Sequence, residues 1–180
     1  QMSEPRGKRI FAVKKELSHV SPEEFKAAMR RFAANVNVIT SSDGNFMNGM
    51  TATAVCSVSA EPPSVLIIVN RTTRSHPIIK RSGVFAVNVL STHQEDLATH
   101  FASKKEDPFM SVDYWNGKTG CPIIQEADAY LECVVKKEIE FSTHTIFVGE
   151  VSASDVTDGE PLLYHAGRFR SLGSPQLAYA

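Results

Sequence analysis

Hydrophobic and polar residues alternate with a period of two through much of this 180-residue chain, a pattern typical of half-buried β-strands. The most informative stretch covers 49–59. One side of it carries small or apolar residues and the other is mostly hydroxyls: Met50, Ala52, Ala54, Cys56 and Val58 against Thr51, Thr53, Val55, Ser57 and Ser59. Small side chains let a flat ligand approach the backbone, and hydroxyl groups bind an anion or water. Periodicity alone favours water as the partner of the hydroxyl row.

Further strand patterns follow along the chain. Six other segments are predicted as strands: 36–40, 65–69, 84–90, 131–141, 145–151 and 162–164. Only short helical segments separate them. Six or seven strands with short flanking helices predict a mainly β fold, a closed antiparallel barrel rather than a doubly wound sheet.

Helical spacing is limited to three short segments. Ser21, followed by Pro22 and two acids, is a predicted helix start, and apolar residues then recur at helical spacing at Phe25, Ala28, Met29 and Phe32. The segments 75–81 and 94–101 are predicted as short helices, with Ser75 as the cap of the first. The chain is thus divided into an N-terminal extension, one domain and a C-terminal tail: 1–20, 21–172 and 173–180. Segment 104–124 is predicted as a long loop that is either functional or packed at an interface.

Composition excludes several classes of function. With 42% hydrophobic and 22% charged residues and a net charge of −1, the chain gives no electrostatic case for binding nucleic acid or an anionic membrane. No apolar run approaches the roughly 20 residues of a membrane span, and no signal-peptide pattern is seen. The odd set of Cys56, Cys121 and Cys133 argues against disulfides, and the histidine and cysteine spacings argue against a metal site. We therefore expect a cytoplasmic protein without a metal.

The candidate chemical groups each have a simpler structural interpretation. His144 lies at a predicted strand break, where it either contacts a cofactor and assists proton transfer or, as position alone favours, is an exposed turn residue. Cys56 falls on the apolar side of its strand, so we expect a core residue and not a nucleophile. A cationic cluster around the predicted helix start at 75 suits either a phosphate or solvent: Arg71, Arg74, Lys80 and Arg81. No Gly-x-Gly-x-x-Gly or Walker loop is present.

A series of ordered sequence blocks resembles the short-chain flavin reductase family, which has the FMN-binding split-barrel fold. The blocks include 25–29, 36–40, 49–58, 62–64, 85–90, 100–102, 122–124, 143–144, 149–151 and 168–169. The similarity runs from about 24 to 172 and is greatest to the reductase components of two-component aromatic monooxygenases.

The resemblance implies a homodimeric NAD(P)H-dependent enzyme that reduces FMN or FAD and passes the reduced flavin to a flavin-dependent oxygenase. It implies flavin contacts at Asn48, Gly49, Met50, Thr51, Thr53, Ala54, Ile68, Val69, Asn70, Arg74, Ser75, His100 and Phe101. It places the nicotinamide donor beside His144, Tyr164, His165, Gly167 and Arg168, with His144 as the catalytic residue.

Two departures from the family pattern concern the nucleotide donor. Thr143 precedes His144 where many relatives have an acid, and Gly167 stands where near relatives carry a basic residue. The choices between NADH and NADPH, and between FMN and FAD, therefore stay open. A reductase of a cobalt-corrin or ferric acceptor and a non-enzymatic flavin-binding module are the alternatives.

Overall fold

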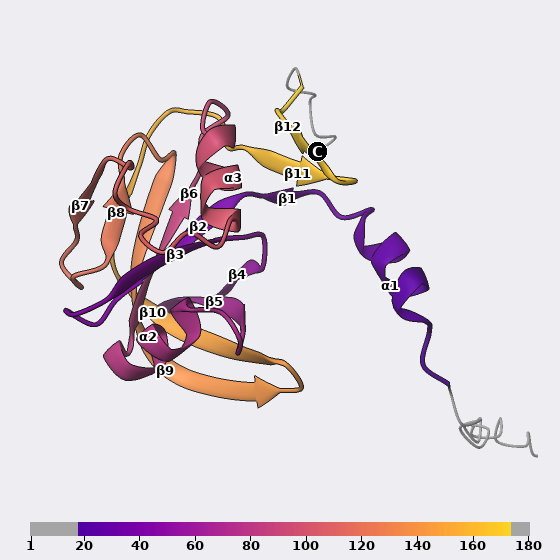
Figure 1. Ribbon diagram of the computed structural model, residues 1–180, viewed down its shortest axis with the longest axis horizontal. Coiled ribbons are helices and arrows are strands. Elements are labelled where there is room, and N and C mark those ends of the chain that lie inside the picture. The colour runs from indigo at the N-terminus through magenta and orange to yellow at the C-terminus, as the bar shows by residue number, and fades with distance from the viewer. Residues whose placement is uncertain (1–17, 174–180) are drawn as a thin grey trace, which may run out of the picture.

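The central element of the structure, a computed structural model that describes residues 18–173, is a seven-stranded antiparallel sheet (Figure 1). Its strand order is β3-β2-β6-β9-β10-β5-β4. In chain order these strands are β2 (Asn37–Ser42), β3 (Met47–Ala52), β4 (Val55–Ala60), β5 (Pro63–Asn70), β6 (Val84–Val89), β9 (Ala129–Phe141) and β10 (His144–Val156). The predicted extension at 1–20 and tail at 173–180 lie almost wholly outside the described residues.

Smaller elements complete the described chain. Three short strands form a second sheet in the order β1-β11-β12: β1 (Ala34–Asn35), β11 (Leu163–His165) and β12 (Arg168–Arg170). A two-stranded hairpin, β7 (Tyr114–Asn116) and β8 (Pro122–Ile124), lies within the segment predicted as a loop. The helices are α1 (Pro22–Met29), α2 (Ser75–Ser82) and α3 (Glu95–Ala102). None of them is long and apolar enough to cross a membrane, as far as residues 18–173 are concerned.

The two edges of the seven-stranded sheet are joined by a very short link. β3 and β4 are the edge strands, yet only Thr53 and Ala54 separate them in the chain. The sheet must therefore curl until its edges meet at this link, which we call the corner. The Ile68 N–H donates to the Ala54 carbonyl at 3.3 Å, just beyond the last β4–β5 pair. This curl gives the predicted antiparallel barrel.

The corner corrects the interpretation of 49–59 as one continuous two-faced strand. Met50 and Ala52 pack on the core as predicted. After the corner the alternation is reversed, because Val55 packs on the core and Cys56 is exposed. The prediction that Cys56 is a core residue is wrong, since the change of chain direction at Thr53 shifts the faces of the following strand.

The main core fills the inside of the curled sheet. Ile39, Ile67, Phe85 and Phe147 are almost completely buried there. A Cβ added to Gly149 of β10 would lie 2.6 Å from Cζ of Phe85, so only glycine fits at this crossing. The inner face is thus closely packed, and a ligand must bind outside it.

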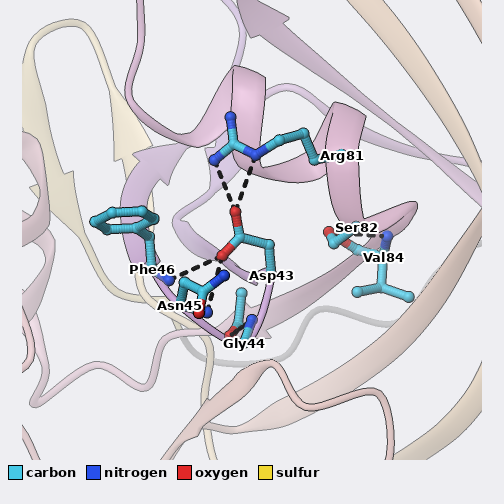
Figure 2. Close-up of polar contacts among 8 residues, drawn as sticks. Asp43, Gly44, Asn45, Phe46, Arg81, Ser82 and Val84 are labelled. Atoms are coloured by element: carbon cyan, nitrogen blue, oxygen red, sulfur yellow. Dashed lines mark hydrogen bonds and ion pairs between the residues drawn. The ribbon is translucent and has the colours of Figure 1, made fainter.

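A polar turn fastens α2 to the β2–β3 hairpin (Figure 2). Arg81 donates from Nε and Nη2 to Oδ2 of Asp43 at 3.0 and 2.7 Å. Oδ1 of the same carboxylate accepts from the backbone N–H groups of Asn45 and Phe46 at 3.1 and 2.8 Å. The Phe46 N–H and the Arg81 guanidinium hold the pKa of Asp43 below its usual value. Both carboxylate oxygens of this turn are therefore engaged within the chain.

The loop predicted over 104–124 is partly ordered by aromatic packing. Phe109 is buried, with its ring centroid 5.2 Å from that of Phe101 on α3 and 5.0 Å from that of Tyr114. Trp115 makes an edge contact with Tyr130 at 5.7 Å. The segment is thus packed on its own chain through these side chains.

Helix α1 begins as predicted and lies apart from both sheets (Figure 1). The Ser21 hydroxyl accepts from the Glu24 N–H, and the Glu24 carboxylate accepts from the Ser21 N–H, which forms a capping box. The helix ends at Met29, so Phe32 lies beyond it. No residue of α1 is buried.

Candidate functional site

The corner presents unsatisfied backbone groups at the surface. Thr53 and Ala54 are both exposed. Within residues 18–173, neither of their N–H groups donates a backbone hydrogen bond. Strand β3, which precedes the corner, is fixed to α3, because the Thr51 hydroxyl donates to the Ala98 carbonyl at 2.6 Å. The corner is therefore a fixed edge with two N–H donors available to a ligand.

Two concave surfaces meet at this edge. A cavity of about 380 Å³ lies between α3 and the β11–β12 hairpin, lined by Val36, Thr51, Ala52, Thr53, Ala98, Thr99, Ala102, Tyr164 and Phe169. A groove of about 780 Å³ continues from Thr53 and Tyr164 past Ala54 and Gly167 to α1. Because Thr53 and Tyr164 line both, the two form one depression of the size that small-molecule sites have.

Three predicted residues lie on the outer face of the sheet beside the corner. Ile68 and Asn70 are two positions apart on β5, so their side chains share one face. His144 of β10 is the cross-strand partner of Asn70. It lies two strands from the corner, on the order of 10 Å away. Val69 points to the other face and is completely buried, so its side chain packs in the core.

His144 is exposed and is oriented by its neighbour in the chain. Its Nδ1 lies 2.8 Å from the hydroxyl oxygen of Thr143. The turn before it is fixed from β5, because Arg71 donates to the Ser142 carbonyl at 2.6 Å and its own N–H donates to the Thr143 carbonyl at 3.0 Å. The His144 imidazole therefore follows a turn that the Arg71 hydrogen bonds fix in place, next to the outer face of the sheet.

The start of α2 is tied to β3 and to the loop after α3. Asn48 Nδ2 donates to the Ser75 hydroxyl at 2.9 Å. Arg74 Nη1 donates to the carbonyls of Lys105 and Glu106 at 2.7 and 3.3 Å. Both bonds use Nη1, so Nη2 and Nε of this guanidinium have no partner in the part of the chain that the structure describes and could bind an anion.

Ser75 does not cap α2, and that prediction is wrong. The N-cap is Arg74, which makes no side-chain capping bond. Ser75 is completely buried, and its hydroxyl is taken by Asn48. It positions β3 against α2 and is not exposed to a ligand.

Gly49, His100 and Phe101 support the site from below. A Cβ on Gly49 would lie 2.5 Å from Cε1 of Phe101, so glycine is needed there to admit the phenyl ring and not a ligand. Phe101 itself is buried. His100 donates from Nε2 to the Pro108 carbonyl at 2.6 Å, and its Nδ1 accepts from Lys105 Nζ at 3.0 Å. These side chains hold β3 and the loop after α3.

The β11–β12 hairpin brings only some of the predicted donor residues to the corner. Ala166 and Gly167 have φ values of 52° and 82°, as in a type I′ turn. This turn places Gly167 and Tyr164 in the lining of the groove. His165 and Arg168 pair with each other across the hairpin. No hydrogen bond or ring contact joins this hairpin to His144 within the described chain.

The structure also shows one candidate functional residue that the sequence did not reveal. His76 is buried, with Nε2 2.8 Å from the Thr145 hydroxyl and its ring tilted on Phe147 at 5.5 Å. Burial lowers the pKa of His76. It joins α2 to β10 one residue from His144. Its partner is 69 positions away, so no local spacing could have indicated the contact.

No group of three or more metal-binding side chains occurs among residues 18–173. The backbone donors of the corner lie in the open depression, whereas the His144 imidazole and the Arg74 guanidinium are not among the residues that line it.

The comparisons with known proteins identify the family to which this split-barrel chain belongs. The sequence model of the family described as "Flavin reductase like domain" matches residues 29–173. The chain belongs to this family, as the sequence blocks predicted.

The relatives cover most of the chain. It is 36% identical to the FMN reductase (NADH) RutF of Stutzerimonas stutzeri over 81% of its length and 85% of that protein. It is 35% identical to the 4-hydroxyphenylacetate 3-monooxygenase reductase component of Pseudomonas aeruginosa, over 90% of this chain and 99% of that one. The Streptomyces globisporus NADH:FAD oxidoreductase SgcE6, in complex with NAD and FAD fragments, superposes with a TM-score of 0.82. The two are 36% identical over 88% of this chain and 98% of the other.

Proposed function

We propose that this protein is an NADH-dependent flavin reductase that supplies reduced FMN or FAD to the oxygenase of a two-component aromatic monooxygenase. The observation that carries the proposal is the corner of the split barrel, where Thr53 and Ala54 offer two N–H groups that have no acceptor among residues 18–173 and that lie in an open depression. Membership of the flavin reductase family and relatives named for NADH, FMN and FAD support it. A bound flavin supplies the acceptor for a hydride from the nicotinamide ring.

The residues present fit a flavin. The N–H groups at the corner suit the carbonyl edge of the ring system, as fixed donors at a site that needs no reorganisation. Arg74 has free guanidinium nitrogens for a phosphate group. Asn48, Ser75, Gly49 and Phe101 act behind this surface by fixing β3 and α2. Flavin contact is thus assigned chiefly to Thr53, Ala54, Ile68, Asn70 and Arg74.

The proposed role of His144 is to contact the nicotinamide donor over the ring and to orient it. Thr143 holds one ring nitrogen, and the residue stands on the outer face next to Asn70. Holding the two rings in contact is the main catalytic contribution we assign to the protein.

The proposed donor is NADH and not NADPH. A 2′-phosphate needs a cation, and Gly167 offers none where related chains carry a basic residue. Its φ of 82° in a two-residue turn favours glycine over a side chain. Relatives named as NADH enzymes support this choice.

Steady-state oxidation of NADH and NADPH with FMN, FAD and riboflavin tests the function. Cob(III)yrinate-type corrins and a ferric chelate serve as alternative acceptors in the same assay. We expect NADH oxidation with a flavin at a kcat/KM at least tenfold above that with NADPH. A preference for a corrin or iron acceptor would favour the other reductase assignment, and no oxidation with any acceptor would overturn the proposal.

The proposal includes a homodimer and a cytoplasmic location. The homodimer follows from the family resemblance and from apolar residues that one copy leaves exposed. Cys56, Cys121 and Cys133 are all free thiols, which suits a reducing compartment. Light scattering on the purified protein and fractionation of the cells that make it test these two points.

A further inference from the structure

Strand β10 enters the core at a polar residue and not at an apolar one. All nine residues from 136 to 144 are exposed, and Thr145 is the first buried residue after them. Its hydroxyl oxygen lies 2.8 Å from Nε2 of His76 on α2, which is also buried. Because His144 directly precedes Thr145, this contact joins the exposed end of the β9–β10 hairpin to the core next to the imidazole.

The His76 ring contacts β10 at two inward-facing positions. Thr145 and Phe147 are two residues apart on the strand, so their side chains share one face, and His144 points to the opposite face. The ring packs on Phe147 at 5.5 Å between centroids and hydrogen-bonds to Thr145. A hydrogen bond restricts distance and direction more closely than an apolar contact does. The pair therefore fixes the position of the strand and does more than fill space.

Three successive residues at the start of α2 each contact a different part of the candidate site. Arg74 donates to the loop after α3, and Ser75 accepts from β3. His76 contacts β10. Since these residues belong to one helix start, the strand that carries His144 is fixed relative to β3 and to the Arg74 guanidinium, which the proposed function assigns to the flavin.

The surroundings of His76 keep its imidazole neutral. Burial lowers the pKa of His76, and the positive charges of Lys80 on α2 and of Arg71 lower it further. Glu138 and Glu140 on β9 act in the opposite direction, but both pair with Lys80, at 3.7 and 2.9 Å. A neutral ring bonds to a buried hydroxyl without placing a charge in the core.

We propose that His76 is a positioning residue for His144. It holds Thr145 from the core side of β10 and thereby sets where the His144 imidazole stands on the outer face. Arg71 fixes the turn before His144 at the surface, so the strand start is held on both sides of this residue. The inference rests on the proposed function for the role of His144 in contacting the nicotinamide donor, but the contact between His76 and β10 does not depend on it.

Substitution of Thr145 tests the proposal by stopped-flow reduction with NADH. Thr145→Val keeps the shape of the side chain and removes the hydroxyl. We expect the rate of flavin reduction to fall about tenfold, within the range for a displaced catalytic group, and the flavin dissociation constant to change by less than about threefold. Thr145→Ser keeps the hydroxyl and should restore the parental rate. A parental rate in Thr145→Val would overturn the proposal.

A matched control removes a buried hydroxyl elsewhere. Thr40 on β2 is completely buried, and its hydroxyl donates to the Pro122 carbonyl at 2.6 Å. Thr40→Val should lower the melting temperature and leave the reduction rate unchanged. An equal loss of rate in Thr40→Val and Thr145→Val would show a general core defect and would contradict a positioning role.

A double variant decides whether the effect passes through His144. In the His144→Ala background, Thr145→Val should cause no further loss of rate, because the group that it displaces is absent. A further tenfold loss would refute the proposal. His76→Leu removes the same contact from α2 and should match Thr145→Val. If His76→Leu does not fold, the comparison of Thr145→Val with Thr145→Ser still decides.

Long-range proton–nitrogen NMR of the imidazole rings tests the position of His144 without catalysis. His144→Ala assigns the His144 signals. We expect these signals to shift or double in Thr145→Val and to match the parent in Thr145→Ser and Thr40→Val. If the signals respond in this way but the parent reduces no flavin, only the proposed function is refuted. If the parent reduces flavin with NADH and neither signals nor rate respond to Thr145→Val, only the positioning role is refuted.

Discussion

The two ends of strand β3 are built in opposite ways. Before it, the turn around Asp43 satisfies both carboxylate oxygens with Arg81 and with the N–H groups of Asn45 and Phe46. After it, the corner at Thr53 and Ala54 leaves its N–H groups without acceptors in the described chain. A turn whose polar groups are all paired serves the fold, and one whose donors stay free at the surface is available to a ligand. The contrast distinguishes a structural turn from the candidate site within a dozen residues of sequence.

The strongest test concerns the imidazole beyond the corner. His144→Ala should lower the rate of flavin reduction by about 100-fold, the lower range for loss of a positioned acid–base or orienting group. The flavin dissociation constant should change less than threefold, because the corner and Arg74 remain. Stopped-flow reduction and flavin fluorescence titration measure the two quantities. Equal reduction rates in variant and parent would refute the role of His144.

Next in size is the packing beneath β3. Gly49→Ala forces a Cβ to within 2.5 Å of the Phe101 ring, and such overpacking costs about 1–3 kcal/mol of unfolding free energy. We expect a lower urea midpoint together with weaker flavin binding, because β3 shifts. The double variant Gly49→Ala/Phe101→Leu should recover part of both losses. If the second substitution restores neither, Phe101 is not the cause.

The corner itself is tested by removing one donor. Ala54→Pro deletes the N–H of Ala54 and keeps the carbonyl that accepts from Ile68. We expect flavin affinity to fall about tenfold, the loss of about one hydrogen bond at 1.4 kcal/mol. Ala54→Ser keeps the N–H and is the matched control. Similar flavin dissociation constants for the two variants would show that the Ala54 N–H does not bind flavin.

The smallest effect is expected at the paired turn. Asp43→Asn should lower the melting temperature slightly and leave flavin affinity unchanged. The folded pKa of Asp43 lies below its unfolded value, so its contribution is present above the unfolded pKa and is lost as pH falls through the folded pKa. Melting temperatures of parent and variant should therefore converge in acid, below about pH 4. A variant that loses flavin affinity would show that the turn belongs to the site.

Features that depend on neighbours in the chain could be predicted from the sequence. The capping box at Ser21 and the alternating strands at 131–141 and 145–151 are local signals, and the structure confirms them. The family resemblance then predicted the split barrel, but not the corner at Thr53 and Ala54. These two levels together predicted the fold class, which the structure confirms, and the region of the candidate site, which stays a prediction.

Features set by distant residues could not be predicted. The break at Thr53 and Ala54 has no glycine or proline to mark it, because closure of the whole sheet imposes it. The need for Gly49 comes from a ring on α3, and the partner of His76 lies on β10. Burial of Phe101 likewise changes its role from contact to support. Each of these depends on which elements the fold brings together.

The shortness of the corner has a consequence for the stability of the protein when no flavin is bound. Thr53 and Ala54 are both the seam that joins the two sheet edges and the proposed seat of the flavin. If the two sheet edges separate at Thr53 and Ala54, the proposed flavin site is lost. A flavin therefore binds only the closed barrel. At a flavin concentration 100 times its dissociation constant, such binding adds about 2.7 kcal/mol to the stability of the closed state. Bound flavin would thus protect the protein from proteolysis, and the protein without flavin would be degraded faster.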